Sequence, residues 1–337
     1  MNFSRIISVT KLLKGTRNQC LTNTKGFCSS VTVNPVNSIE KISDASESFP
    51  ETVDDLPTYF SPTFNFAAYI NKSETLRKFV ELGVDLSKLE KKKGIAQFIL
   101  KLDFDKNVKD YLILLHDLGL PPECYGYMLT KNPLILKESI SDLETRIFYL
   151  RSKKFSLEQV QEIVGKNPYW LSFSTRRIDR RLGWFQKNFK LTSNDLRFLV
   201  TKQPRLITYN LEHIRENSFC IKEEMGFDGD EVKILLLSCP RLWMNNRETI
   251  FDRFDYIHNW MDISHDRILQ SPEILTNRLS RLKQRFQFLK LLGKAQFDET
   301  KPGYISFKMF LEGSDEDFVL KVCKSSLERY DNFLKTL

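Results

Sequence analysis

The segment Lys166-Asn167-Pro168-Tyr169-Trp170-Leu171 is one of five similar segments in this 337-residue chain. In each of them a proline is followed by a short, mainly apolar run. The five prolines are Pro133, Pro168, Pro204, Pro240 and Pro272, separated by 35, 36, 36 and 32 residues. Self-similarity at such a period is typical of solenoids, in which each unit buries its apolar face against its neighbours. The sequence therefore predicts a repeat protein.

An apolar triplet with spacing i, i+4, i+7 lies about ten residues after each proline, as in Ile178, Leu182 and Phe185. This spacing places three side chains on one stripe of an α-helix. The triplet after Pro204 is interrupted by Ser218. The other copies, including one that precedes Pro133, are Val108/Leu112/Leu115, Leu143/Ile147/Leu150, Ile250/Phe254/Ile257 and Leu282/Phe286/Leu289.

A second helix is predicted in each unit, because residue pairs such as Ser156 with Gln159 and Asp228 with Glu231 fit the capping-box pattern. Candidate caps of the equivalent helices are Thr192 or Ser193 for one and Ser264 for another. The proline ends this helix, since it lacks an amide hydrogen and its ring clashes with the preceding turn. Too few residues follow for a full helix, so a 3₁₀ turn is expected. The predicted fold is an all-α, curved solenoid of helix–helix–3₁₀ units.

Three segments are predicted along the chain: a leader at residues 1–39, a linker at 40–73 and the repeat domain at 74–335. Residues 1–39 contain five Lys or Arg, many Ser, Thr and Asn, and no acidic residue. This composition is typical of a mitochondrial transit peptide. Residues 40–57 contain six acids and one lysine, with few apolar residues, which predicts a largely disordered linker. The units at 74–107 and 297–337 are divergent, as end repeats are expected to be.

The positive charge of the chain is concentrated in its middle. The formal net charge is +8, but the leader contributes five of the 51 basic residues, leaving 46 against 43 acids. Residues 166–220 hold eleven Lys or Arg against four acids. A basic patch confined to two adjacent repeats is the pattern expected for binding a polyanion.

No catalytic, metal-binding or membrane-spanning pattern is visible in the sequence. There is no Gly-rich phosphate loop, G-x-S-x-G or H-E-x-x-H motif, and no apolar run approaches the roughly 18 residues that cross a bilayer. His258 and His265 can meet across a turn, but zinc needs more ligands than lie nearby. The six cysteines form no C-x-x-C pair, and Cys124, Cys220 and Cys239 fall on or beside apolar helical positions. We expect no enzyme activity, cofactor, metal or membrane association.

The repeat resembles that of the mitochondrial transcription termination factor (mTERF) family. The resemblance lies in an apolar helix, a capped second helix and P-x-x-L, and it covers roughly residues 74–335. It is carried by Lys131-Asn-Pro-Leu-Ile-Leu, Lys166-Asn-Pro-Tyr-Trp-Leu and Cys239-Pro-Arg-Leu-Trp. A single P-x-x-L means little, but five copies in register with two helices are specific.

The resemblance implies a monomeric α-helical superhelix that binds nucleic acid along a basic groove in the mitochondrial matrix. The expected ligands are double-stranded mitochondrial DNA, at the promoter region, and ribosomal RNA. The expected roles are repression or modulation of transcription initiation and biogenesis of the large ribosomal subunit, with transcription or ribosome-assembly proteins as further partners. Two alternatives remain: a pentatricopeptide-like protein, which would bind single-stranded RNA, and a helical scaffold for proteins.

Candidate phosphate contacts are the basic residues that the repeat pattern does not require. Arg176, Arg177 and Arg180 cluster at the start of one helix, and Arg205 and Arg241 directly follow their prolines. The full set of predicted nucleic-acid contacts is Arg176, Arg177, Arg180, Arg181, Lys187, Lys202, Arg205, Arg215 and Arg241.

Other basic residues recur with the repeat itself. An arginine stands at the same register as Arg181 in three other repeats, with Asn217 in the remaining one, so a structural role and a phosphate contact are both open for it. Lys131, Lys166 and Lys202, each two residues before a proline, can instead complement a helix C-terminal dipole. Trp170 and Trp243 occupy apolar repeat positions and are predicted to lie in the core.

Overall fold

The computed structural model describes residues 65–337, so the predicted leader and most of the predicted linker lie outside the described residues. Residues Tyr69–Leu337 form one of the two units into which the chain divides. This unit is helical and, within the described residues, contains no strand. Helix α2 (Ala67–Ile70) lies within the segment predicted as linker, and α3 begins at Glu74, where the repeat domain was predicted to start.

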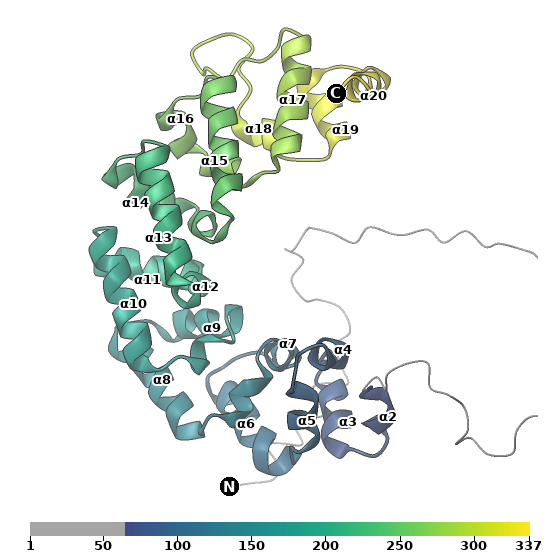
Figure 1. Cartoon of the computed structure of the whole chain (residues 1–337), viewed down its shortest axis with the longest axis vertical. Helices are drawn as coiled ribbons and strands as arrows, with labels where there is room; N and C mark the ends of the chain where they lie inside the picture. Colours follow the sequence, from purple (N-terminus) through teal and green to yellow (C-terminus); the bar gives the residue numbers. More distant parts are fainter. Residues whose placement is uncertain (1–64) are drawn as a thin grey trace, which may run out of the picture. The chain divides into compact units, whose positions relative to one another are not determined.

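The helices of this unit follow one another in chain order, each packing on its neighbours (Figure 1). Before the first proline turn come α3 (Glu74–Glu81), α4 (Leu86–Glu90), α5 (Ile95–Leu100), η2 (Phe104–Val108), α6 (Lys109–Asp117) and α7 (Glu123–Lys131). The next two repeats contain η3 (Pro133–Lys137), α8 (Ile140–Ser152), α9 (Leu157–Lys166), η4 (Trp170–Ser172), α10 (Thr175–Asn188) and α11 (Ser193–Lys202).

The C-terminal part of the array continues the same order. It contains α12 (Pro204–Thr208), α13 (Leu211–Phe219), η5 (Cys220–Glu224), α14 (Gly229–Ser238), η6 (Pro240–Met244), α15 (Arg247–Asp255), η7 (Tyr256–Trp260), α16 (His265–Gln270) and η8 (Pro272–Thr276). The last elements are α17 (Leu279–Leu291), α18 (Phe307–Leu311), α19 (Asp315–Asp317), η9 (Phe318–Cys323) and α20 (Leu327–Leu334).

The five prolines stand at helix boundaries, as predicted. Pro133, Pro240 and Pro272 each open a 3₁₀ turn, and the 3₁₀ turn after Pro168 begins at Trp170. Proline suits the first position of a helix because its missing amide hydrogen would have no intrahelical partner there. The turn at Pro204 differs from the prediction, since α12 is α-helical instead of 3₁₀.

Most of the predicted caps form; of the two candidates for α11, Thr192 is the cap and Ser193 is the first helical residue. Both capping boxes form, between Ser156 and Gln159 and between Asp228 and Glu231. Thr192 caps α11, and its partner Asp195 completes a third capping box. Ser264 occupies the cap position of α16 with extended backbone, but its side chain makes no capping hydrogen bond.

The core contains most of the predicted apolar stripes, although Leu112, Ile147 and Phe286 are only half-buried. Ile178, Leu182 and Phe185 are buried on α10, and Leu199 and Leu235 are fully buried on the second helices. Trp170 and Trp243 are also buried, as predicted. The irregular Ser218 has a specific role: its hydroxyl accepts a hydrogen bond from Nε1 of Trp243 at 2.9 Å and donates one to the carbonyl of Ile214 at 2.7 Å. The serine therefore satisfies a buried tryptophan N–H of the next repeat.

The recurring arginine joins adjacent repeats through hydrogen bonds to backbone carbonyls, and we call this contact the clasp. Arg146 donates to the carbonyl of Leu171, Arg181 to that of Ile207 at 2.7 Å, and Arg253 to that of Leu275 at 3.2 Å. In each case the acceptor is in the short helix that opens the following repeat, or directly beyond it. Of the two roles left open by the sequence, the structure shows the structural one.

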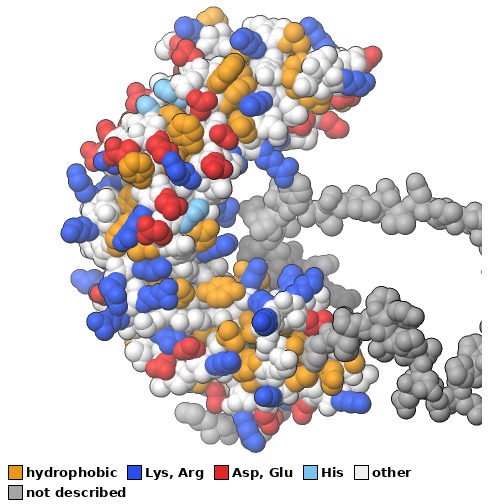
Figure 2. Space-filling model, in the orientation of Figure 1, with side chains coloured by type: hydrophobic (Ala, Val, Ile, Leu, Met, Phe, Trp, Pro, Cys, Tyr) orange, Lys and Arg blue, Asp and Glu red, His pale blue; other side chains and the backbone are white. Residues whose placement is uncertain are grey.

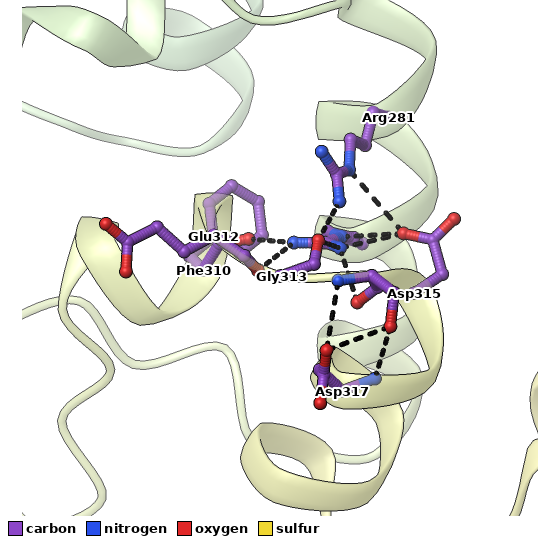
Figure 3. Close-up of polar contacts among 8 residues, drawn as sticks. Arg281, Phe310, Glu312, Gly313, Asp315 and Asp317 are labelled. Carbon is purple, nitrogen blue, oxygen red and sulfur yellow. Dashed lines mark hydrogen bonds and ion pairs between the residues drawn. The ribbon is translucent and has the colours of Figure 1, made fainter. Parts of the chain in front are cut away.

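The last clasp, Arg285, is buried and joins α17 to the C-terminal helices. Figure 3 shows the neighbouring residues Arg281, Phe310 and Asp315 around this contact. The Arg285 guanidinium donates to the carbonyls of Phe310 at 2.7 Å and Ser314 at 3.0 Å, and it pairs with the Asp315 carboxylate at 2.8 Å. Arg281 reaches the same carboxylate at 3.5 Å. Burial lowers the pKa of Arg285, and the hydrogen bond to Asp315 opposes this shift. These contacts fix the divergent last unit to the regular array.

Candidate nucleic-acid interface

We call the exposed side chains of the proline turns and of the C-terminal ends of the second helices the turn face. Neighbouring repeats touch here, because Tyr169 donates to the carbonyl of Lys131 and Lys166 to that of Thr201. The turn face is defined by the side chains Tyr127, Lys131, Lys166, Tyr169, Phe198, Lys202, Arg205 and Arg241. These residues come from α7, α9, α11 and the short helices that follow them. The turn face therefore extends over several repeats.

The lysines of the turn face are partly engaged by the scaffold. Nζ of Lys202 donates to the carbonyls of Leu237 at 2.9 Å and Ser238 at 2.7 Å, at the C-terminus of α14. Nζ of Lys166 pairs with Glu162 at 2.5 Å and lies 3.3 Å from the carbonyl of Thr201 at the end of α11. Each of these two lysines thus complements the negative helix end of the next repeat. The predicted dipole role holds, although the dipole belongs to the neighbouring unit.

Arg205 and Arg241 are the exposed cations that follow their prolines in adjacent repeats. The Arg205 guanidinium lies 5.7 Å from the ring centre of Tyr209. Among the described residues, Arg241 has no ion pair or side-chain hydrogen bond. Because neither arginine is needed to hold the fold, both are available to an anionic ligand.

Aromatic rings are also exposed on the turn face, and two of them lie close to its lysines. Phe198 is 52% exposed, Tyr127 47% and Tyr169 44%, and Nζ of Lys202 lies 5.4 Å from the Phe198 ring centre. Between α9 and α11 an open groove of about 410 Å³ is lined by Phe198, Lys202 and polar side chains. Exposed rings beside cations are the components of surfaces that stack bases and contact phosphates. The sequence missed Tyr127 and Phe198, although both stand six residues before a proline.

A second group of predicted contacts lies on a different side of the repeat. Arg176, Arg180 and Lys187 are spaced i, i+4 and i+11 on α10, so they share one stripe at 100° per residue. That stripe is opposite the buried face of α10, which packs on α11 and α12. Figure 1 shows α10 and α12 on opposite sides of the array, and Figure 2 shows Lys and Arg side chains gathered over α10. We call this surface the cationic stripe.

The remaining predicted residues make hydrogen bonds, ion pairs or ring contacts within the protein. Arg181 is the clasp described above; its burial, together with the charge of Arg177, lowers its pKa. The Arg177 guanidinium lies 4.4 Å from the ring centre of Phe173. Arg215 pairs with Glu212 at 3.2 Å and lies over the Trp184 ring at 5.8 Å. The nine predicted residues therefore do not form one patch.

Two cysteines and two histidines of the described region take part in packing and in hydrogen bonds to the backbone. Burial raises the pKa of the Cys220 and Cys323 thiols to about 11, which keeps both protonated near neutral pH. The rings of His258 and His265 stack at 4.8 Å, as the sequence allowed, and each bonds a backbone carbonyl. Within residues 65–337 no group of three or more His, Cys, Asp or Glu could hold a metal ion. No helix in this range is long and apolar enough to cross a membrane.

Comparison with known proteins identifies the class. The family model described as mTERF matches residues 31–319, and the chain belongs to the mTERF family. This agrees with the resemblance found in the repeats and with the helical solenoid described above.

Within the family, the sequence around Leu115-His-Asp-Leu-Gly-Leu and the long divergent first unit indicate a resemblance to the third metazoan member, and the relatives found agree with it. Mitochondrial transcription termination factor 3 of Drosophila melanogaster is 54% identical over 275 residues, covering 82% of this chain and 78% of the relative. The mouse protein of the same name is 39% identical, with coverage of 82% and 67%. Human mitochondrial transcription termination factor 1 is 25% identical, with coverage of 56% and 48%.

Proposed function

We propose that this protein is a nucleic-acid-binding regulator of transcription in the mitochondrial matrix, and that it binds through the turn face. The observation that carries the proposal is the pair Arg205 and Arg241, both exposed at equivalent positions of adjacent repeats, with the Arg205 guanidinium 5.7 Å from the ring centre of Tyr209. Arginines at fixed spacing suit the regular phosphates of a strand. The relatives' names, mitochondrial transcription termination factors 1 and 3, support transcription as the process.

The more specific proposal is binding to the promoter region of mitochondrial DNA to repress or modulate transcription initiation. A second role, in ribosomal RNA binding and large-subunit biogenesis, is favoured by the exposed rings, because the bases of single-stranded RNA are open to stacking. Partner proteins would then come from transcription or from ribosome assembly. Crosslinking in isolated mitochondria, followed by sequencing of the bound nucleic acid, distinguishes the DNA target from the RNA target.

The turn face is tested by a salt titration of binding. Replacing Arg205 and Arg241 together by Gln should lower the slope of log K against log salt by about 1.8 on duplex DNA, or about 1.4 on a single strand, if each arginine contacts one phosphate. Helicity and melting temperature should not change, since neither side chain holds the fold. An unchanged slope on both ligands would place the interface elsewhere.

The matched comparison is the triple replacement of Arg176, Arg177 and Arg180 by Gln. The sequence assigned these arginines to phosphates, but two of them lie on the cationic stripe, on the other side of α10. We therefore expect this variant to keep the slope of the wild type. Absence of binding to both ligands by the wild type would favour the alternative of a helical scaffold for proteins.

A further inference from the structure

The positions of the cationic stripe carry a different charge in each repeat. Eight and twelve residues after the proline, α10 has Arg176 and Arg180, and α13 has Glu212 and Glu216. The other repeats have Ser141 and Thr145, Glu248 and Asp252, and Ser280 and Gln284 at these positions. Because the scaffold accepts neutral, acidic and basic residues there, it does not require the cations of α10.

The charges of α10 and α13 are opposite in sign at equivalent helix positions, which we call levels. Arg176 and Glu212, Arg180 and Glu216, and Lys187 and Glu223 each lie 36 residues apart, which is the spacing of Pro168 and Pro204. The last level is less regular, because Glu223 lies in the π-helical turn η5. The two helices are neighbours, as the contact of Arg215 with the Trp184 ring shows. Both stripes point outward, opposite the buried stripes of their helices.

At one further level, an exposed aromatic ring on α13 corresponds to a glycine on α10. Phe219 is 59% exposed on α13. Its counterpart on α10, 36 residues earlier, is Gly183. A Cβ added at Gly183 would have no atom within 4 Å, so the surface of α10 is open at this level. A large apolar side chain in solvent, at the level of an empty position on the next helix, is suited to a contact with another molecule.

A second copy of this chain fits this surface. In a face-to-face pair, the two-fold axis lies in the interface, parallel to α10 and α13 and midway between them. Rotation about this axis places α13 of the second copy opposite α10 of the first. Arg180 then faces Glu216 of the second copy, and Phe219 faces Gly183 of the second copy. The same rotation repeats both contacts, as an isologous interface requires. We propose that the protein self-associates through the paired faces of α10 and α13.

The pair Arg180 and Glu216 is the central contact of this interface. Within residues 65–337, neither has an ion-pair partner in the same chain, whereas Glu212 pairs with Arg215 and Glu223 with Lys222. A nucleic-acid strand laid across α10 would meet the carboxylates of α13 at the same levels, so a second copy suits the surface better. The interface comprises only two helix faces, which predicts weak association that salt screens. This differs from the monomer expected from the sequence.

The test is sedimentation velocity of the full chain at low ionic strength over a concentration series. We expect the wild type to form a dimer that dissociates at high salt. Arg180→Glu and Glu216→Arg each place like charges opposite one another twice, which should weaken association about tenfold or more. A mixture of the two variants should associate as the wild type does. In that heterodimer the new carboxylate at position 180 of one chain faces the new guanidinium at position 216 of the other, and the unchanged Glu216 faces the unchanged Arg180.

Three further variants sharpen the result. Phe219→Ser should weaken association, whereas Arg241→Glu, on the turn face, should leave association unchanged while it weakens nucleic-acid binding. A wild type that remains monomeric at about 100 μM would overturn the proposal. The proposal would also be overturned if the mixture of Arg180→Glu and Glu216→Arg failed to associate. The same holds if Arg180→Glu impaired only nucleic-acid binding. Arg180→Lys, which keeps the charge, should still associate.

Discussion

Asn217 donates from Nδ2 to the carbonyl oxygen of Trp243 at 3.0 Å, and so acts as the clasp that arginine provides in the neighbouring repeats. The amide also reaches the carbonyl of Asn245 at 2.9 Å. Asn217 is fully buried. A shorter, neutral side chain replaces the guanidinium here without loss of the backbone contact, so in this repeat the contact needs hydrogen-bond donors but no charge. Ser218, the next residue, holds the indole of the same tryptophan.

Replacing Ser218 by Leu should destabilise the protein, although it restores the apolar pattern of the other repeats. The substitution removes the acceptor for Nε1 of Trp243 and inserts a larger side chain into a packed site. Leaving a buried donor unsatisfied costs about 1–3 kcal/mol. Denaturant unfolding of the two proteins measures the difference. A stabilised Ser218→Leu variant would show that the hydroxyl is not needed.

Replacing Arg181 by Met should lower the free energy of unfolding by about 1–3 kcal/mol, since the carbonyl of Ile207 loses its donor. Lys187→Met on the same helix is the control. Lys187 is exposed, so its loss should change stability by less than about 0.5 kcal/mol. Equal effects of the two substitutions would contradict the structural role of Arg181.

Leu199→Ala and Leu235→Ala should each cost about 2–5 kcal/mol, because both side chains are fully buried between repeats. Phe198→Ala is the matched control beside Leu199 on the exposed side of α11. Thermal or denaturant unfolding gives the values. A loss below about 0.5 kcal/mol at both leucines would show that the helical register is wrong.

Phe198→Ala should weaken binding to single-stranded ribosomal RNA more than binding to duplex DNA. A base stacked on an aromatic ring contributes about 1–3 kcal/mol, and duplex bases are not free to stack on it. Fluorescence anisotropy with both ligands measures the two affinities. Phe148→Ala provides the control, since that ring is 70% exposed but lies on α8, outside the turn face. If both variants bind RNA like the wild type, the rings of the turn face do not stack on bases.

The sequence by itself determined the repeat, its pair of helices and the prolines at the helix boundaries. It did not determine that α12 is α-helical, or that α13 and α15 continue into the π-helical turns η5 and η7. The features that it determined depend on neighbours three to eight residues apart, such as the Ile178, Leu182 and Phe185 stripe, the Ser156 capping box and the proline that follows each second helix. Local hydrogen bonding and helical periodicity are enough to read them. The family could also be recognised, because five copies of P-x-x-L stand in register.

Only the tertiary structure decided what each basic residue does. Arg180 and Arg181 are adjacent in sequence, yet Arg181 bonds a carbonyl 26 residues away and Arg180 faces outward. Consecutive residues of a helix point in directions about 100° apart, so Arg181 faces the next repeat while Arg180 does not. The same holds for Lys202, whose acceptors lie 35 and 36 residues on, and for Ser218, whose partner is 25 residues on. Charge can be counted along a chain, but the side on which it lies depends on how one repeat packs on the next.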